Sequence, residues 1–430
     1  MFNQNGLSLD QAPPISVVLR FFLSGSIFGI LAGILVLFFG TAVFDPANIE
    51  AVILTHTLTL GVMLSFMFAA LFQMLPVIAG VRLTAPTAKA NLVQYPFIFG
   101  VISLLFAFRT GDTLLFTAAS LLLGSSILGI VGIMLKNLLR LPFHSASSKG
   151  MTVALIALVI LTALALYLTA TLAGIIEGSY YVQFKTAHYS FGLFGWVALL
   201  IISISFQVIE MFYVTPQYPA FVTKFLPLKL LALLIFGFVL SFVMEDVWMI
   251  VTLLIALHLI GYALLTLRRL TQRKRPITDA TVWFWRLGLF LLILSMGATV
   301  NIQFMTIPKL QTLNYIFFAG FALSIVFAMF YKIVPFLTWF HLNSQGYFTA
   351  PMMHEVIHPK TAMKHLYIHL TTLVTFMLSV FISPLIYVAG VLTILSFGWM
   401  LWQIAHAWKL YIHTQKTGEK FEMKMPEANV

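Results

Sequence analysis

Long stretches of apolar residues follow one another along almost the whole chain, separated by short polar segments. A helix needs about 20 apolar residues to cross the hydrocarbon core of a bilayer. These runs are too long for the strands of a membrane barrel, so helices must satisfy the backbone hydrogen bonds within the lipid. The sequence therefore predicts an all-α polytopic membrane protein of about twelve transmembrane helices. The expected spans are 16–44, 51–80, 91–108, 112–136, 151–176, 187–214, 226–244, 247–267, 280–304, 312–338, 364–385 and 387–410.

The overall composition agrees with a chain that is surrounded by lipid. Hydrophobic residues make up 61% of the 430 residues and charged residues only 9%, against about 25% in soluble domains. The chain has no cysteine, which excludes disulfides, thiolate metal sites and iron–sulfur clusters. Asp10 and two prolines stand before the first apolar run, so we expect no cleavable signal peptide. We expect the net charge of +11 to reflect orientation in the membrane rather than nucleic-acid binding.

Basic residues are concentrated in alternate loops. One set of loops carries Arg82, Lys89, Lys136, Arg140, Lys149, Lys224, Lys229, Arg268, Arg269, Arg273, Lys274, Arg275, Lys360, Lys364, Lys409, Lys416, Lys420 and Lys424. The other set carries only Arg109, Lys185 and Lys309, together with most of the acidic loop residues. Because basic loops stay on the cytoplasmic side, we expect both termini to be cytoplasmic.

Three of the expected spans share one sequence pattern. In spans 2, 6 and 10, a glycine precedes a polar residue by twelve positions, and the aligned segments are 61–73, 195–207 and 320–332. Pro76, Glu210 and Pro335 then occupy one further column. A chance match of glycine and apolar residues is the alternative explanation. As a repeat, the pattern predicts one membrane domain made of three four-helix units, roughly 16–136, 151–267 and 280–410, followed by a polar tail over 411–430.

The repeat places three polar residues near the outer ends of equivalent helices. His56, His188 and Asn314 precede the repeat glycines by five, seven and six positions. Spans 2, 6 and 10 would then line a shared interior, and Gly61 and Gly195 would let a bulky group approach closely. Two neutral imidazoles from different helices are a suitable ligand set for a metal or a haem. The simpler alternative is that they are interfacial histidines bonded to water or to a carbonyl.

The twelve helices in three units, with a histidine near the outer end of span 2, resemble the catalytic subunit of haem–copper oxidases. The segments SFQVIEMFYVTPQYP and KIVPFLTWFHL are more similar to the diverged, nitric-oxide-associated membrane proteins of the NnrS type. The topological resemblance covers residues 16–410, and the motif resemblance is confined to spans 2, 6 and 10. It implies a haem held by His56 and His188, in a bacterial inner-membrane protein.

The sequence also departs from the oxidase pattern. His188 is followed by Tyr189 and Ser190, the chain has no adjacent pair of histidines, and Asn314 stands where the tenth helix would need a ligand. The motif for the three-histidine copper site is therefore missing, and we do not expect this chain to be an oxygen-reducing terminal oxidase. Copper remains a second metal that the site could hold.

Three further ionisable residues stand within the expected spans. His258 lies near the middle of span 8, where it could be another metal ligand or a hydrogen-bonding residue between helices. Glu210 and Lys332 lie toward the inner ends of spans 6 and 10, where they could pair across the interior. Such a pair would orient the helices or carry protons or ions.

The segment HEVIH, residues 354–358, matches the H-E-x-x-H pattern of zinc enzymes. It lies in an expected cytoplasmic loop, and Pro359 follows directly, which is poor context for a helical zinc site. With His341, His365 and His369 nearby, a metal site remains one alternative, and loop or interface histidines are the other.

The sequence thus favours a haem-binding membrane protein connected with redox, nitric-oxide or respiratory-stress chemistry, as the resemblance implies. Its expected partners are the lipid bilayer and a respiratory-chain or redox protein, and no nucleic acid. One alternative is a haem-free transporter or channel that uses the pseudo-threefold interior. Another is an assembly partner of a respiratory complex.

Overall fold

A computed structural model describes residues 12–81, 83–275 and 279–420 of the chain. In these ranges the protein is helical, and the one β-bridge, between Tyr347 and Lys420, is isolated. Two residues used for the orientation, Arg82 and Lys424, lie outside the described residues. The expected tail begins as helix, because α15 continues to Thr417.

The helices follow one another with short connections. They are α1 (Ile15–Phe39), η2 (Gly40–Phe44), α2 (Ile49–His56), η3 (Thr57–Leu64), α3 (Ser65–Ala79), α4 (Pro86–Thr110), α5 (Thr113–Leu139), α6 (Ala146–Leu172), α7 (Tyr181–Ser190), η4 (Phe191–Ala198), α8 (Leu199–Tyr213), α9 (Ala220–Leu240), α10 (Val247–Thr271), α11 (Ala280–Phe304), α12 (Leu310–Ser344), α13 (Met353–Val356), α14 (Pro359–Ser379) and α15 (Leu385–Thr417).

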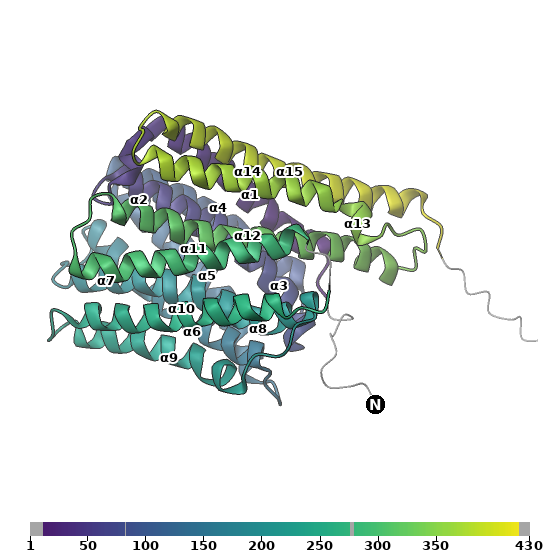
Figure 1. Cartoon of the computed structure of the whole chain (residues 1–430), viewed down its shortest axis with the longest axis horizontal. Coiled ribbons are helices and arrows are strands. Elements are labelled where there is room, and N and C mark those ends of the chain that lie inside the picture. The colour runs from purple at the N-terminus through teal and green to yellow at the C-terminus, as the bar shows by residue number, and fades with distance from the viewer. Residues whose placement is uncertain (1–11, 82, 276–278, 421–430) are drawn as a thin grey trace, which may run out of the picture.

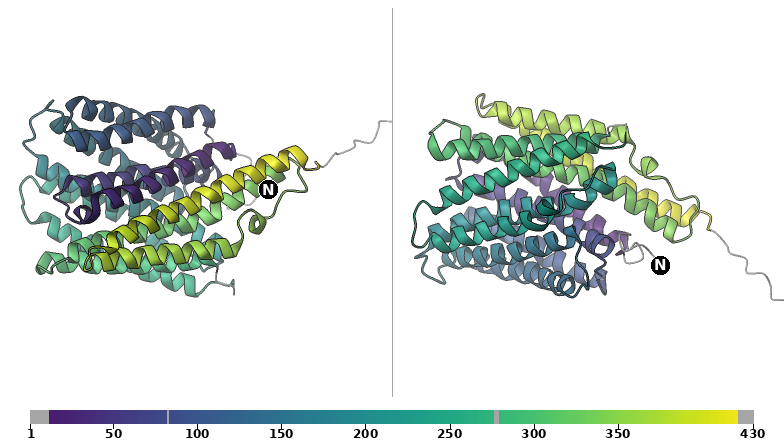
Figure 2. Two further views of the ribbon diagram at one scale, coloured as in Figure 1. Left: turned by 90° about the horizontal axis from the view of Figure 1, so that it is seen from above. Right: turned by 60° about the horizontal axis from the view of Figure 1, so that its bottom comes forward.

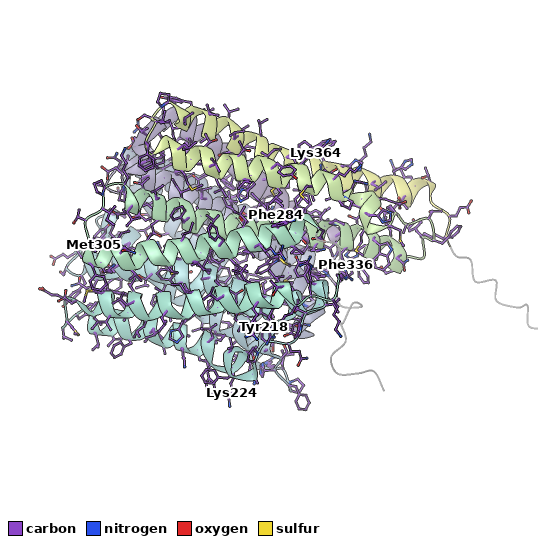
Figure 3. The ribbon with its side chains drawn as sticks, viewed as in Figure 1. Tyr218, Lys224, Phe284, Met305, Phe336 and Lys364 are labelled. Atoms are coloured by element: carbon purple, nitrogen blue, oxygen red, sulfur yellow. The ribbon has the colours of Figure 1, made fainter. Side chains whose placement is uncertain are left out.

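The long helices run roughly parallel and antiparallel to one another in a single bundle (Figures 1 and 2). We call the end that carries α2 and α7 the histidine end, and the end where α1 begins and α15 finishes the terminal end. In Figure 3, Met305 marks the histidine end, and Phe336 and Lys224 lie toward the terminal end. The chain alternates between the two ends, as a multi-pass membrane protein requires.

Eleven helices in the described residues are long and apolar enough to cross a membrane, and they correspond to eleven of the expected spans. The expected span 364–385 corresponds to α14, which is not among the eleven. The reason is that α14 carries Lys364, His365 and His369 within its 21 residues. Both histidines are buried against neighbouring helices, so these polar side chains face the bundle rather than the outside.

The three helices of the repeat form the inside of the bundle, as expected. Their most apolar windows, in 49–77, 181–213 and 310–344, are 78%, 78% and 72% buried, whereas those of the other eight spans are 33–50% buried. Inner helices must be apolar all round, because they touch protein on every side. The shared interior predicted from the glycine pattern is therefore confirmed.

The first and the last spans close the bundle against each other. Helices α1 and α15 lie side by side (Figure 1), and glycines allow their backbones to approach closely. A Cβ atom on Gly33 would lie 2.8 Å from the carbonyl oxygen of Gly390 and 2.9 Å from the backbone nitrogen of Ile394. Backbone atoms cannot move aside as a flexible side chain can, so this crossing tolerates no side chain at Gly33.

We therefore expect Gly33→Ala to destabilise the protein by about 1–3 kcal/mol, because the added methyl forces α1 and α15 apart. The matched control is Gly129→Ala on α5, where an added Cβ would have no neighbour within 4 Å. The control should be neutral or slightly stabilising, since alanine favours helix over glycine. Thermal unfolding in detergent would compare the two, and equal melting temperatures would contradict the packing argument.

Candidate functional site

His56 and His188 lie next to each other near the histidine end. Their ring centres are 6.3 Å apart, and the ring planes are nearly parallel, at 15°. His56 is the last residue of α2, and His188 lies in the last turn of α7. Each is only partly exposed. The structure therefore brings together the two histidines that the sequence singled out.

The two histidines enter this site through matching local structure. Directly after α2 the backbone widens into a π-helical segment, Thr57–Leu64, and directly after α7 it does so again over Phe191–Ala198. Gly61 and Gly195 are each the fifth residue of their segment. Such π-helical segments are rare and are frequent at functional sites. The pseudo-equivalence of spans 2 and 6 thus extends to their backbone, which the sequence pattern did not reveal.

The imidazole of His56 is held in one orientation. Its Nδ1 lies 2.8 Å from the carbonyl oxygen of Val52. A carbonyl only accepts, so Nδ1 carries the proton and Nε2 keeps its lone pair. Metal-binding histidines commonly donate their second nitrogen to a backbone carbonyl in this way. Nδ1 of His188 is buried and makes no hydrogen bond of regular geometry, with the backbone of Leu161 as its polar neighbour.

The two ring centres are 6.3 Å apart, which leaves room for one metal ion if a nitrogen of each ring turns toward it. Two metal–nitrogen bonds of about 2 Å and two distances of about 1 Å from nitrogen to ring centre add up to about 6 Å. No group of three His, Asp or Glu side chains converges anywhere in the described residues. A donor set of two nitrogens is too small for a structural zinc site, but it could hold a cofactor that supplies the remaining ligands itself.

Aromatic and charged side chains surround the pair. The ring of Phe108, from α4, lies 4.9 Å from the ring of His56. Near the start of α2, Glu50 forms an ion pair of 3.3 Å with Arg109, the basic residue in the last turn of α4. This exposed pair contributes little to stability. Together with Phe108, it joins α2 to α4 beside His56.

The third position of the repeat does not join the pair. Asn314 accepts a hydrogen bond from Ser295 Oγ at 2.6 Å and donates one to Thr299 Oγ1 at 2.9 Å. Both partners belong to the neighbouring helix α11. Its amide binds α11, and the inclusion of Asn314 among the cofactor-binding residues stays a prediction.

The repeat glycines accommodate neighbouring helices. A Cβ on Gly61 would meet the ring of Phe28 at 2.6 Å, and one on Gly195 would meet Leu234 at 3.0 Å. At Gly320 it would meet Leu291 at 2.8 Å. The expected close approach is thus real, but the group that approaches is a side chain of another helix. The assignment of Gly61 and Gly195 to cofactor binding stays a prediction.

His258 lies away from the candidate site. It is partly exposed on α10, and its Nδ1 lies 2.7 Å from the carbonyl oxygen of Leu254 in its own helix. It belongs to no cluster of potential ligands within the described residues. The prediction that His258 is a metal ligand is therefore not supported by the geometry. The bond to its own helix satisfies the ring without a partner helix.

Glu210 and Lys332 do not pair, contrary to the prediction. Lys332 Nζ lies 2.6 Å from Oδ2 of Asp279, at the start of the adjacent helix α11. Glu210 instead accepts a hydrogen bond of 2.8 Å from the backbone N–H of Tyr218. Each charge therefore has a local partner. The alignment of spans 6 and 10 could not show which neighbour each side chain would reach.

The HEVIH segment does not form a zinc site. Helix α13 is only four residues long, and Glu355 accepts a hydrogen bond of 2.7 Å from Met352 N. His358 accepts one of 3.2 Å from Lys360 N at the start of α14. Both residues therefore act as helix caps. The nearby His365 and His369 are buried between helices, with Nε2 atoms 2.8 Å from Ser396 Oγ and 2.9 Å from Ser324 Oγ.

Comparison with known proteins adds no relative to this picture. No protein-family model matches the sequence. No curated protein matches it either.

Proposed function

We propose that this protein is a membrane haem protein in which His56 and His188 provide the two axial ligands of one haem. The observation that carries this proposal is the pair of nearly parallel imidazoles with ring centres 6.3 Å apart, which come from two inner helices. The fixed tautomer of His56 supports it, because the bond to Val52 leaves Nε2 free to bind. The resemblance to haem–copper oxidases and to NnrS-type proteins points to the same cofactor.

Each part of the site has a role in this function. A haem held by His56 and His188 would supply one-electron redox chemistry. The two π-helical segments set the height of the histidines in the bundle, and the Val52 carbonyl sets the orientation of the His56 ring. Phe108 packs beside His56 and reduces the access of water. This arrangement favours electron transfer, and it agrees with the missing three-histidine copper motif.

The redox role belongs to the same proposal. We propose that the protein serves respiratory or nitric-oxide metabolism in a bacterial inner membrane, with a redox protein as its partner. Both termini would face the cytoplasm, because the basic loops lie at the terminal end and such loops remain on the cytoplasmic side. The haem would then lie in the outer half of the membrane.

Transport through the pseudo-threefold interior is the weaker alternative. The space between α3, α8 and α12 is small and lined by apolar side chains, which would oppose the passage of an ion. Lys332 and Glu210, the charges expected on such a pathway, are held by Asp279 and by the Tyr218 backbone. A role as an assembly partner has no specific observation in its favour.

The absorption spectrum of protein purified in detergent from haem-replete cells tests the proposal. We expect a strong Soret band, with reduced and oxidised spectra typical of low-spin iron, and about one iron per chain by metal analysis. A colourless preparation would contradict the haem. Copper in place of iron would show that the two histidines bind a bare metal ion instead.

A further inference from the structure

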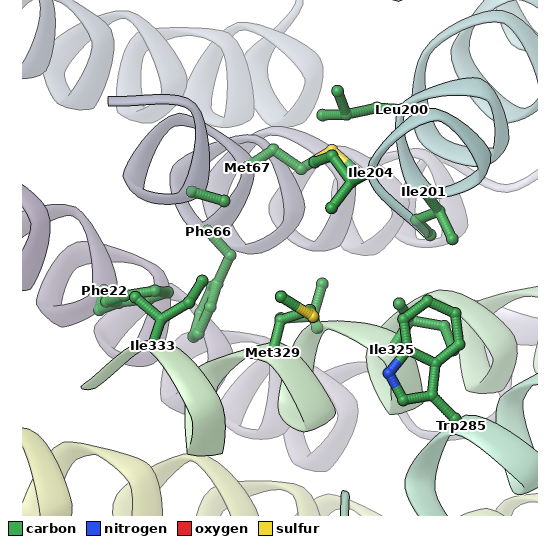
Figure 4. Close-up of a pocket in the computed structure, with 12 residues that line it drawn as sticks. Phe22, Phe66, Met67, Leu200, Ile201, Ile204, Trp285, Ile325, Met329 and Ile333 are labelled. Atoms are coloured by element: carbon green, nitrogen blue, oxygen red, sulfur yellow. The ribbon is translucent and has the colours of Figure 1, made fainter. Parts of the chain in front are cut away.

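A cavity lies at the centre of the bundle, where α3, α8 and α12 meet (Figure 4). Its volume is about 50 Å³. The lining side chains are aliphatic, aromatic or methionine, and apart from the indole nitrogen of Trp285 they carry no nitrogen or oxygen atom. All of them except Ala70 are buried. This is a different place from the histidine pair, and it does not depend on a haem.

The cavity follows the pseudo-threefold symmetry of the chain. In each inner helix, three of the lining residues stand five, six and nine positions after the repeat glycine, and α12 adds Ile333. These are Phe66, Met67 and Ala70 after Gly61, Leu200, Ile201 and Ile204 after Gly195, and Ile325, Val326 and Met329 after Gly320. Three equivalent sets of side chains therefore point at one axis. The cavity is a consequence of the repeat and not a random packing fault.

One column of the repeat explains why space remains. Nine positions after the glycine, α8 carries Ile204 and α12 carries Met329, but α3 carries Ala70. Two large side chains and one methyl group meet at this level of the axis. Interiors are normally packed to the density of organic crystals, so a missing side chain leaves a void that its neighbours fill only in part.

The chemistry of the lining selects what can occupy this space. A buried water needs two to four polar partners, and apolar cavities of this kind stay dry and take up apolar guests such as xenon. A charged or strongly polar guest would lose its hydration without compensation. The volume admits only a few heavy atoms. We infer that the cavity binds a small apolar gas molecule, of the class of dioxygen or nitric oxide, which reaches it from the surrounding hydrocarbon.

Crystals of the full-length protein pressurised with xenon test this inference. We expect anomalous density for xenon between Ala70, Ile204 and Met329. The Ala70→Ile variant carries an isoleucine at this position, as α8 does at Ile204. The xenon density should disappear in this variant. Ala405→Ile is the matched control, because this substitution adds the same atoms at an exposed position on α15 that does not line the cavity. It should bind xenon like the unmodified protein.

A second measurement uses the indole of Trp285, which lines the cavity and is buried. The fluorescence of Trp285 is obtained by subtracting the emission of Trp285→Phe from that of the unmodified protein. Dissolved oxygen should quench this fluorescence, and the quenching should be weaker in Ala70→Ile. No xenon at the axis of the unmodified protein, or ordered water there, would overturn the inference whether or not Ala70→Ile folds. Xenon that persists in a folded Ala70→Ile variant would overturn the role of the alanine.

Discussion

Protein with His56→Ala or His188→Ala is expected to lose most of the Soret absorbance while keeping its helical content and its melting behaviour. Each substitution removes one of the two neighbouring imidazoles that would hold the proposed haem. With one ligand left, the remaining haem should become high-spin, and with both replaced the band should vanish. Both side chains are only partly buried, so alanine at either position should leave the bundle intact.

His258→Ala is the matched control for this experiment. It removes an imidazole from the same membrane protein at a residue of α10 whose ring is bonded to the Leu254 carbonyl of its own helix. Its spectrum should equal that of the unmodified protein. Added imidazole should restore part of the low-spin spectrum in the single variants, because it can enter the space left by the missing ring. Unchanged spectra in His56→Ala and His188→Ala would remove this pair from the cofactor site.

The ion pair between Lys332 and Asp279 is expected to have the second largest effect. The two side chains are 18% and 37% exposed, and Nζ lies 5.4 Å from the ring centre of Tyr213. Asp279→Ala leaves the ammonium group without an anion at the bundle surface, which should cost about 1–3 kcal/mol after allowance for partial exposure. Lys332→Met should cost less, because Asp279 still accepts hydrogen bonds from Thr281 and Val282.

The pH dependence of unfolding gives an independent measure of this pair. Burial raises the pKa of the Asp279 carboxyl, but Lys332 and the hydrogen bonds from Thr281 and Val282 outweigh it, and the pKa is lowered from its ordinary value. A lowered pKa in the folded state stabilises the protein above the unfolded pKa of about 4. This stability is lost as the pH falls through the lowered pKa. Asp279→Asn should remove that part of the pH dependence.

Thermal unfolding in detergent between neutral and acidic pH would measure both effects. Reversing both charges, with Lys332→Asp and Asp279→Lys, should recover stability that either single reversal loses. Glu210→Gln is the control, since glutamine can still accept the hydrogen bond from Tyr218. A large effect of Glu210→Gln, or none of Asp279→Ala, would show that the ion pair described here is not the one that stabilises the protein.

Much of the fold and part of the candidate site follow from the sequence. The length of the apolar runs predicts the helices, because each run must satisfy its own hydrogen bonds in lipid. The glycine at the start of each aligned segment predicts which three helices are inside. It also places His56 and His188 at similar heights, because they precede the glycines of equivalent helices by five and seven positions. The span α14 is less apolar than the other spans, because it carries His365 and His369. The side chains of both histidines are buried inside the bundle.

The pairing of side chains could not be read from the same pattern. Lys332 reaches Asp279 rather than Glu210, and Asn314 binds Ser295 and Thr299 of α11. A long side chain can reach several neighbours, and the rotation of each helix about its axis decides which one it meets. The π-helical segments escaped prediction for a related reason, since they need one more residue per turn and leave no mark in composition.

Sequence alone thus determined that the chain spans the membrane many times, which helices lie inside and at what height the two histidines stand. These properties depend on the apolar length and on the spacing along one helix, which are local. Only the tertiary structure decided that the two rings face each other at 6.3 Å, and that Ala70 leaves a cavity at the axis. Both depend on how separate helices turn and pack against one another, and no single segment carries that information.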